Sequence, residues 1–186
     1  KEYTFNGIRQ HNRNNLLWRD PAVDGLKTGH TEAAGYCLAS SAKDQGMRLI
    51  SVVMGSASEQ SRASESQSLL SYGFRFFETM QLYRAGDQLT EARVWKGDGE
   101  QVRLGVAEDL FVTIPRGRYD DLDAQLHLPD TLTAPISGGE ELGRVSIELD
   151  GAIIADLGLQ ALDEVPEADR RREQIKQIVT SFVNSF

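Results

Sequence analysis

The sequence predicts an α+β protein: an antiparallel sheet with one helix, then a small all-β sandwich or barrel, then an amphipathic C-terminal helix. Three observations support this prediction. Near the N-terminus, three β-prone runs are separated by short turn signals and followed by a helical pattern. From Gly86 onward, short alternating runs are bounded by Gly, Pro and Asp. After Pro166 the apolar residues return to helical spacing.

Length and composition indicate an ordinary globular protein. With 186 residues, 40% of them apolar and 26% charged, the chain can form one large domain or two small ones. The net charge of −8 argues against a nucleic-acid partner, because there is no basic stripe to neutralise phosphates. The single cysteine, Cys37, excludes an internal disulfide, and we expect it to be a small core residue. The opening "KEYTFNGIRQ" resembles the middle of a protein, so we expect a C-terminal piece of something longer.

The first domain is predicted from residues 1 to 82. Residues 1–20 indicate a short strand followed by the polar loop "HNRNN". The runs "GLKTGHT", "GYCLASSAK" and "MRLISVVMG" are separated by the turn signals "EAAG" and "DQG", which predicts an antiparallel meander. One helix is expected in "SEQSRASESQSLLSYGFRFFETM", and it would leave one face of the sheet short of cover. The apolar positions of this helix pattern are Leu69, Leu70, Gly73, Phe76, Phe77 and Met80.

Residues 83–165 are predicted to form a β-rich domain, with the boundary near Leu82 to Gly86. Six alternating runs support this: "QLTEARVWKG", "QVRLGV", "DLFVTIPRG", "LDAQLHL", "LGRVSIELDG" and "IIADLGLQAL". Nothing in these runs indicates catalysis. Asp98 and Asp109 are expected to be turn acids, and the "PRGR" of residues 115–118 a loop rather than a phosphate site.

Residues 166–186 are predicted to form an amphipathic helix with one apolar stripe. The charges of residues 170–186 sum to +3. Two interpretations are open: a helix docked on its own domain, or a helix lying in the plane of a membrane surface. The stripe consists of Ile175, Ile178, Val179, Phe182, Val183 and Phe186.

Two short motifs compete as the site of chemistry. Lys27-Thr28-Gly29 lies in the strand-like "VDGLKTGHT"; by itself it could be an exposed strand lysine beside a turn threonine. Ser40 and Lys43 match S-x-x-K, a pattern that needs both side chains on one face. Positions i and i+3 share a face of a helix but point to opposite faces of a strand. Because the pattern of "YCLASSAK" predicts a strand, we expect the S-x-x-K match to be coincidental.

The flanks of the K-T-G element resemble one family over essentially the whole chain. "KTGHT", "AGY", "MRLISVVMG", "GFRFFET" and "VTIPRGR" are similar to the D-alanyl-D-alanine carboxypeptidases, low-molecular-mass penicillin-binding proteins of the serine acyl-enzyme class. The resemblance implies that residues 1–82 are the C-terminal part of a penicillin-binding/β-lactamase-like catalytic domain. It implies a stalk for residues 83–165 and favours membrane attachment for the tail, on the periplasmic, outer face of the cytoplasmic membrane.

The resemblance also implies roles for the K-T-G residues, which would border the active-site cleft. Lys27 and Thr28 would supply a cation and a hydroxyl for the substrate carboxylate, and Gly29 would keep the wall clear of a side chain. The backbone N–H of His30 would form half of the oxyanion hole, whereas no direct chemical role is expected for its imidazole.

Arg62 matches an arginine that the family places near the substrate carboxylate. The alternative is a solvated arginine in the first turn of the helix, paired with Glu59 or Glu65.

The implied activity is removal of the terminal D-alanine from peptidoglycan pentapeptide stems through an acyl-enzyme, with β-lactams acylating the same serine. The nucleophile S-x-x-K and the S-x-N element are expected in a missing N-terminal part, so this chain alone should not turn over. A related β-lactamase is one alternative, although it would not need the β-rich domain and tail. A non-catalytic module that binds cell wall or a partner is another. No cofactor or metal is expected, because His11 and His127 lack a second ligand at metal spacing.

Overall fold

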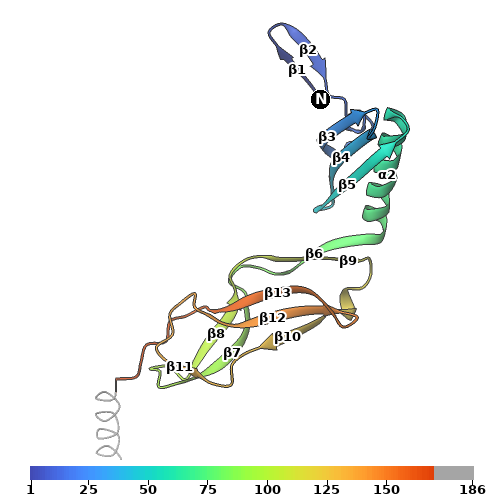
Figure 1. The fold of residues 1–186 in the computed structure, drawn as a ribbon. Helices are drawn as coiled ribbons and strands as arrows, with labels where there is room; N and C mark the ends of the chain where they lie inside the picture. Colours follow the sequence, from blue (N-terminus) through green and yellow to red (C-terminus); the bar gives the residue numbers. More distant parts are fainter. Residues whose placement is uncertain (170–186) are drawn as a thin grey trace, which may run out of the picture. The chain divides into compact units, whose positions relative to one another are not determined.

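The computed structural model describes residues 1–169 and divides them into two compact units (Figure 1). The first unit consists of Lys1–Thr79 and Thr113–Gly117, and the second of Met80–Val112 and the chain from Arg118 onward. The predicted apolar stripe between Ile175 and Phe186 lies outside the described residues.

The first unit contains the predicted antiparallel meander. Strands β3 (Val23–Thr31), β4 (Gly35–Asp44) and β5 (Met47–Ser56) form a three-stranded sheet in the order β3-β4-β5, which confirms this part of the prediction. The N-terminal prediction was incomplete, because β1 (Glu2–Phe5) and β2 (Ile8–His11) form a hairpin around Asn6 and Gly7. Both turn residues have positive φ, as the Asn-Gly signature of a two-residue hairpin turn requires.

Helix α2 (Glu59–Phe76) follows the sheet, and the short helix α1 (Leu16–Arg19) precedes it. The side chain of Ser58 accepts a hydrogen bond from the N–H of Ser61 and caps α2 at its N-terminus. The predicted extension of this helix to Met80 was wrong, since β6 (Phe77–Tyr83) begins directly after it and pairs with β9 (Leu110–Pro115). At the end of α2, the Arg116 guanidinium donates to the carbonyls of Phe74 and Phe77. This distant pairing and capping decide where the helix stops.

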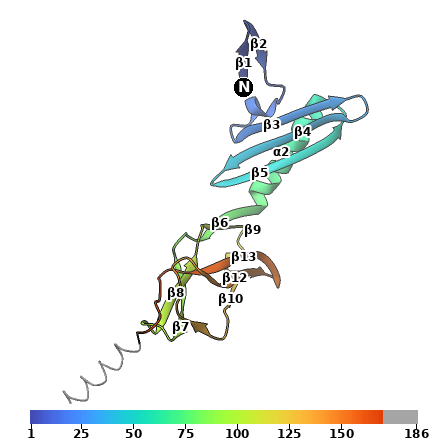
Figure 2. The ribbon, with the colours of Figure 1, turned by 60° about the vertical axis from the view of Figure 1, so that its left-hand side comes forward.

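One face of the β3-β4-β5 sheet is covered by α2, and the other is open (Figure 2). Leu38 of β4 is buried together with Ala63 and Leu70 of α2. On the opposite face, the three apolar side chains of β5 are between 62% and 75% exposed. The expectation that one face is short of cover is therefore confirmed for the described residues. These exposed side chains are Ile50, Val52 and Met54.

The second unit is rich in β-strands, and the six predicted runs all contain strands. A mixed six-stranded sheet has the order β10-β12-β13-β8-β7-β11, and the β6–β9 ribbon carries the chain into this unit and back. A hydrophobic cluster of this unit includes Leu104, Val102 and Val165. The elements are β7 (Gln88–Trp95), β8 (Gln101–Val106), a 3-10 helix η1 (Tyr119–Asp121), β10 (Asp123–His127), β11 (Leu132–Thr133), β12 (Glu141–Leu149) and β13 (Ala152–Ala161).

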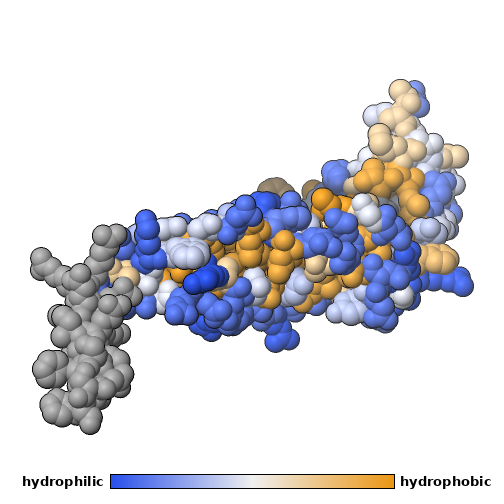
Figure 3. All heavy atoms as spheres, turned by 90° about the horizontal axis from the view of Figure 1, so that it is seen from below, coloured by the Kyte–Doolittle hydropathy of each residue, from blue (hydrophilic) through white to orange (hydrophobic). Residues whose placement is uncertain are grey.

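The surface in the view of Figure 3 shows apolar side chains in several separate places among charged ones. Exposed apolar residues occur in both units, for example Met54 in the first and Trp95 in the second. Single exposed apolar residues are normal on soluble domains, so each has to be interpreted through its neighbours.

Gly105 in β8 tests the packing of the second unit. A Cβ at this position would overlap with the backbone carbonyl of Asp87 and lie 3.0 Å from Leu162. Because a backbone carbonyl cannot rotate away, we expect Gly105→Ala to lower the free energy of unfolding by about 1–3 kcal/mol in urea denaturation. Gly138→Ala is the matched control, since the nearest atom to its new Cβ would be 3.9 Å away. Equal stability of the two variants would contradict this packing.

Candidate active-site wall

The K-T-G element lies on β3, the edge strand of the three-stranded sheet. Among the described residues, β3 pairs only with β4, with Lys27 opposite Ala39, Thr28 opposite Leu38, and His30 opposite Tyr36. Successive side chains of a strand point to opposite faces, whereas residues paired directly across two strands share a face. The register therefore decides the face on which each motif residue lies.

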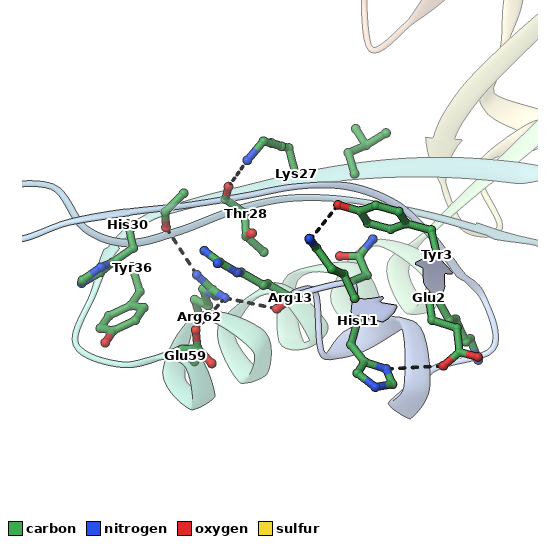
Figure 4. A pocket seen from close by; sticks show the side chains of 15 residues that line it. Glu2, Tyr3, His11, Arg13, Lys27, Thr28, His30, Tyr36, Glu59 and Arg62 are labelled. Carbon is green, nitrogen blue, oxygen red and sulfur yellow. Dashed lines mark hydrogen bonds and ion pairs between the residues drawn. The ribbon is translucent and has the colours of Figure 1, made fainter. Parts of the chain in front are cut away.

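Lys27 and Thr28 leave the strand on opposite sides. Thr28 shares the face of Leu38, which is buried beneath α2. Lys27 shares the open face with Ala39 and, across β5, with the exposed Val52. Figure 4 shows the lysine on one side of the strand and the Thr28 side chain on the other. The Lys27 ammonium donates to the Thr28 carbonyl at 2.6 Å. The Lys27 ammonium can bind the same carboxylate as the Thr28 hydroxyl only if the lysine side chain turns around the edge of the strand.

Arg62 is buried in the first turns of α2, with only 3% of its surface exposed. Its guanidinium donates to the carbonyls of Gly29 (3.3 Å) and Arg13 (3.2 Å) and lies 3.4 Å from a Glu59 carboxylate oxygen. The alternative of a solvated arginine is wrong, because Arg62 is buried. The pairing with Glu59 that this alternative included is present. Glu65 instead accepts a hydrogen bond from the Ser56 hydroxyl.

The carbonyl that Arg62 binds, that of Gly29, shares its peptide bond with the His30 N–H, the expected oxyanion donor. The Gly29 carbonyl and the His30 N–H belong to the same planar amide, so a group that holds the carbonyl also fixes the direction of the N–H. A cation on the carbonyl oxygen also polarises the amide and makes its N–H a stronger donor. This link between Arg62 and His30 joins α2 to the strand edge.

The His30 imidazole stacks on Tyr36. The two ring centroids are 4.0 Å apart with an interplanar angle of 28°, and the Arg62 guanidinium lies 5.6 Å from the centroid of the same tyrosine ring. Tyr36 is half-buried, so it supports both side chains from the base of the site. Cys37, the next residue along β4, is half-buried and lies outside the hydrophobic cluster of this unit, so its expected place in the core was wrong.

A cavity of about 600 Å³ lies in front of this wall and includes residues that the sequence analysis missed. The β1–β2 hairpin contributes Tyr3 and His11, and the loop after it contributes Arg13 (Figure 4). The buried Asn14 anchors that loop, since its amide donates to the Gly25 carbonyl at 3.0 Å. The signal in the sequence is the polar run "HNRNN", which begins at the end of the hairpin and carries both Arg13 and Asn14.

The Ser40–Lys43 pair is excluded as a catalytic dyad by its place in β4. Ser40 is fully buried and its hydroxyl hydrogen-bonds the Ser51 hydroxyl at 2.7 Å, whereas Lys43 is exposed at the end of the strand. Three residues apart on a strand, the two side chains point to opposite faces. The expectation that this S-x-x-K match is coincidental is confirmed.

An ion pair braces the start of β3. Arg48 of β5 binds the Asp24 carboxylate at 2.8–2.9 Å and also contacts the Ser41 hydroxyl of the central strand. The hydrogen bonds from Arg48 and Ser41 lower the pKa of Asp24 below its usual value, and the hydrogen bond to Asp24 raises the pKa of Arg48. The carboxylate is thus charged at neutral pH, and it ties all three strands together three residues before Lys27.

The remaining candidates lie apart from this wall or have other partners. His11 faces Glu2 at 3.5 Å, and His127 hydrogen-bonds Ser146 in the second unit. Asp109 accepts a hydrogen bond from the Ala85 N–H, as a turn acid does. The loop predicted for residues 115–118 is confirmed for 116–118, whereas Pro115 is the last residue of β9. In residues 1–169, no three His, Cys, Asp or Glu side chains cluster as metal ligands would. Within the same range, every helix is too short or too polar to cross a membrane.

Comparison with known proteins gives a consistent result in both units. The family model of D-alanyl-D-alanine carboxypeptidase matches residues 1–58, and that of the penicillin-binding protein 5 C-terminal domain matches residues 77–167. The D-alanyl-D-alanine carboxypeptidase DacA of Escherichia coli K12 is 47% identical over 171 residues, which is 91% of this chain and 42% of that protein. DacF of Bacillus subtilis is 32% identical over 158 residues, covering 84% of this chain and 41% of the relative.

Solved structures agree with the sequence comparison. Penicillin-binding protein 5 of Haemophilus influenzae superimposes with a TM-score of 0.81 at 46% identity, covering 90% of this chain and 49% of that one. The DacD carboxypeptidase of Francisella tularensis gives a TM-score of 0.63 at 35% identity, over 87% of this chain and 40% of that one. The chain thus spans less than half the length of each of these four proteins. It belongs to the D-alanyl-D-alanine carboxypeptidase family.

Proposed function

We propose that this chain provides one wall of the active site of a D-alanyl-D-alanine carboxypeptidase of peptidoglycan maturation. The observation that carries the proposal is the exposed K-T-G edge of β3, with Arg62 bound behind it to the Gly29 carbonyl. The substrate class is the peptidoglycan pentapeptide stem, which ends in a free carboxylate. In this proposal, the enzyme removes the terminal D-alanine.

The lining of the cavity supports an anionic ligand. Four cations line it, including Lys27, Arg13 and Arg62, against the two carboxylates of Glu2 and Glu59, and Thr28 adds a hydroxyl on the α2 side of the strand. Cations in a concave site attract a carboxylate, and a guanidinium or hydroxyl can then hold it by charge-assisted hydrogen bonds. Thr28 is therefore proposed as the donor to the carboxylate, with the arginines supplying the positive field.

The proposed reaction is acyl transfer to a serine from outside this chain. The serine oxygen attacks the penultimate carbonyl, and the His30 N–H donates to the oxyanion that forms there. Collapse of the tetrahedral intermediate breaks the peptide bond, D-alanine leaves with a proton, and water then hydrolyses the ester. A β-lactam presents a similarly placed carboxylate and would acylate the same serine. Lys27, on the open face of the sheet, would meet the side of the cleft that holds this serine.

The open face of the sheet supports the proposal that more of the catalytic domain packs here. Ile50, Val52 and Met54 are solvent-exposed. Burying one such side chain fully contributes roughly 1.5–3 kcal/mol. An upstream part of the protein that covered this face would bring its own groups towards Lys27, and we propose that the nucleophile arrives in this way.

The remaining assignments complete the proposal. Residues 1–82 would be the catalytic part and residues 83–165 a stalk. Residues 166–186 would attach the protein to the outer surface of the cytoplasmic membrane, in the periplasm. A β-lactamase is the alternative within the same chemistry, and a non-catalytic module that binds the cell wall is the alternative without it.

The intact mass of the denatured protein, with and without benzylpenicillin, tests the proposal. We expect the full-length protein to gain one drug mass, and the 186-residue chain alone to gain none, because its Ser40 is buried beside Ser51. Penicillin hydrolysed beforehand is the control and should add no mass to either. If the full-length protein remains unmodified, the enzyme proposal fails and the binding module is favoured.

A further inference from the structure

The second unit has a tryptophan close to the point where the described chain ends. The Ala168 N–H donates to the Lys96 carbonyl, and the Asp98 N–H donates to the Pro166 carbonyl, both at 2.8–2.9 Å. Gly97 forms an isolated bridge with Glu167. Figures 1 and 2 both show the end of β7 beside the end of the described chain. The turn after β7 is therefore hydrogen-bonded to residues 166–168, from which the C-terminal tail continues.

Trp95, the last residue of β7, is exposed although its neighbour Val94 is buried. Trp95 is 51% exposed, and the Arg93 guanidinium lies 4.4 Å from the centroid of its ring. Lys96, directly after it, is also exposed. Trp95 therefore differs from the other exposed apolar residues of this unit in what surrounds it: a guanidinium lies over its ring, and a second exposed cation follows it in sequence.

The tail starts within reach of this tryptophan. The apolar stripe begins at Ile175, six residues after Asp169, and six residues span at most about 20 Å. If the stripe lies in a membrane surface, the turn after β7 has to stay near that surface. Tryptophan favours the boundary between lipid headgroups and acyl chains, where its ring is in an apolar environment and its N–H can meet water or lipid oxygens.

Charge alone does not explain this surface. Arg93 and Lys96 lie beside Asp98, Glu100 and Glu167, so the turn has no net positive charge. The contact is therefore expected to depend on the indole, with Arg93 and Lys96 pairing with lipid phosphates and the carboxylates facing water. Its dependence on anionic lipid should accordingly be weak.

We propose that Trp95, with Arg93 and Lys96, is a second membrane contact that enters the lipid headgroup region when the tail binds. The inference rests on the proposed attachment of the tail to a membrane. It adds that the second unit itself touches the bilayer, so attachment has two contact points rather than one. The alternative partner of the Trp95 indole is the C-terminal tail itself, docked on its own unit.

Fluorescence can isolate this contact because the chain has only two tryptophans, Trp18 and Trp95. In Trp18→Phe the sole indole is Trp95, and the matched control Trp95→Phe retains only Trp18. Each 186-residue variant is mixed with phosphatidylethanolamine–phosphatidylglycerol vesicles, with and without brominated acyl chains, and binding is measured by sedimentation. We expect Trp95 emission to shift to the blue and to be quenched by brominated lipid, and Trp18 emission to change little. Trp95→Ser should weaken vesicle binding by about 3- to 10-fold while leaving the circular dichroism spectrum unchanged.

The outcomes separate this inference from the attachment on which it rests. Sedimentation with vesicles without quenching of Trp95 would overturn the second contact but retain the tail as an anchor. No sedimentation would overturn both. A blue-shifted Trp95 emission in the absence of lipid, abolished by Phe182→Asp, would show the tail docked on the indole and would also overturn the inference.

Discussion

Lys27→Ala in the full-length enzyme is expected to slow acylation by benzylpenicillin by at least about two orders of magnitude, the usual effect of losing a group that stabilises developing charge. Lys27 is the motif cation on the open face of β3, where the proposed nucleophile would be brought. Its side chain is exposed and, within residues 1–169, hydrogen-bonds only the Thr28 carbonyl, so the free energy of unfolding should change by less than about 0.5 kcal/mol. The measurement is the acylation rate, followed by intact mass at several times.

Lys43→Ala is the matched control, because it removes the same charge from an exposed lysine of the adjacent strand. We expect its acylation rate to equal that of the unmodified enzyme. Ser40→Ala tests the other half of the coincidental motif. It should cost about 1 kcal/mol of stability by leaving the buried Ser51 hydroxyl without its partner, and it should leave acylation intact. Loss of acylation in either control, or its survival in Lys27→Ala, would contradict the proposed site.

Sequence reasoning succeeded where local pattern and tertiary structure agree. The runs that form β3, β4 and β5 are bounded by turns, and their β-branched and alternating residues leave little choice of structure. The same holds for the six runs predicted between residues 83 and 165. The strand setting of Ser40 and Lys43 was enough to reject that motif, because the period of a strand separates their side chains.

Sequence reasoning failed where a residue or strand that is distant in sequence determines the local structure. Phe77 and Met80 continue the helical spacing of α2, but β9 pairs with this segment and Arg116 caps the helix before it. The burial of Arg62 was also beyond reach, since its carbonyl partner at Gly29 lies 33 residues away along the chain. No local pattern distinguishes a solvated arginine in a first turn from one that turns inward to a strand.

Arg62→Ala in the full-length enzyme is the second large effect that we expect. The substitution leaves the Gly29 and Arg13 carbonyls without this donor and creates a cavity beside Tyr36, which should lower the free energy of unfolding by about 2–4 kcal/mol. Acylation should slow by about 100-fold or more at a temperature where the variant is still folded, because the His30 N–H loses its fixed direction. Arg62→Lys keeps the charge but not the planar fork, and should recover only part of both losses.

Two roles of Arg62 can be separated by kinetics with substrates that differ in their terminal carboxylate. If Arg62 positions the Gly29–His30 peptide, kcat falls for a depsipeptide with the carboxylate and for its amide analogue alike, because both need the oxyanion donor. If Arg62 instead binds the carboxylate, KM rises for the first substrate and the second is unaffected. The buried contacts with Gly29 and Arg13 favour the first result. Arg75→Ala is the control, since it removes an exposed arginine of the same helix that also lies over an aromatic ring, and it should leave kcat and KM unchanged. A fall in kcat for Arg75→Ala equal to that for Arg62→Ala would assign the loss to α2 as a whole rather than to the Arg62–Gly29 hydrogen bond.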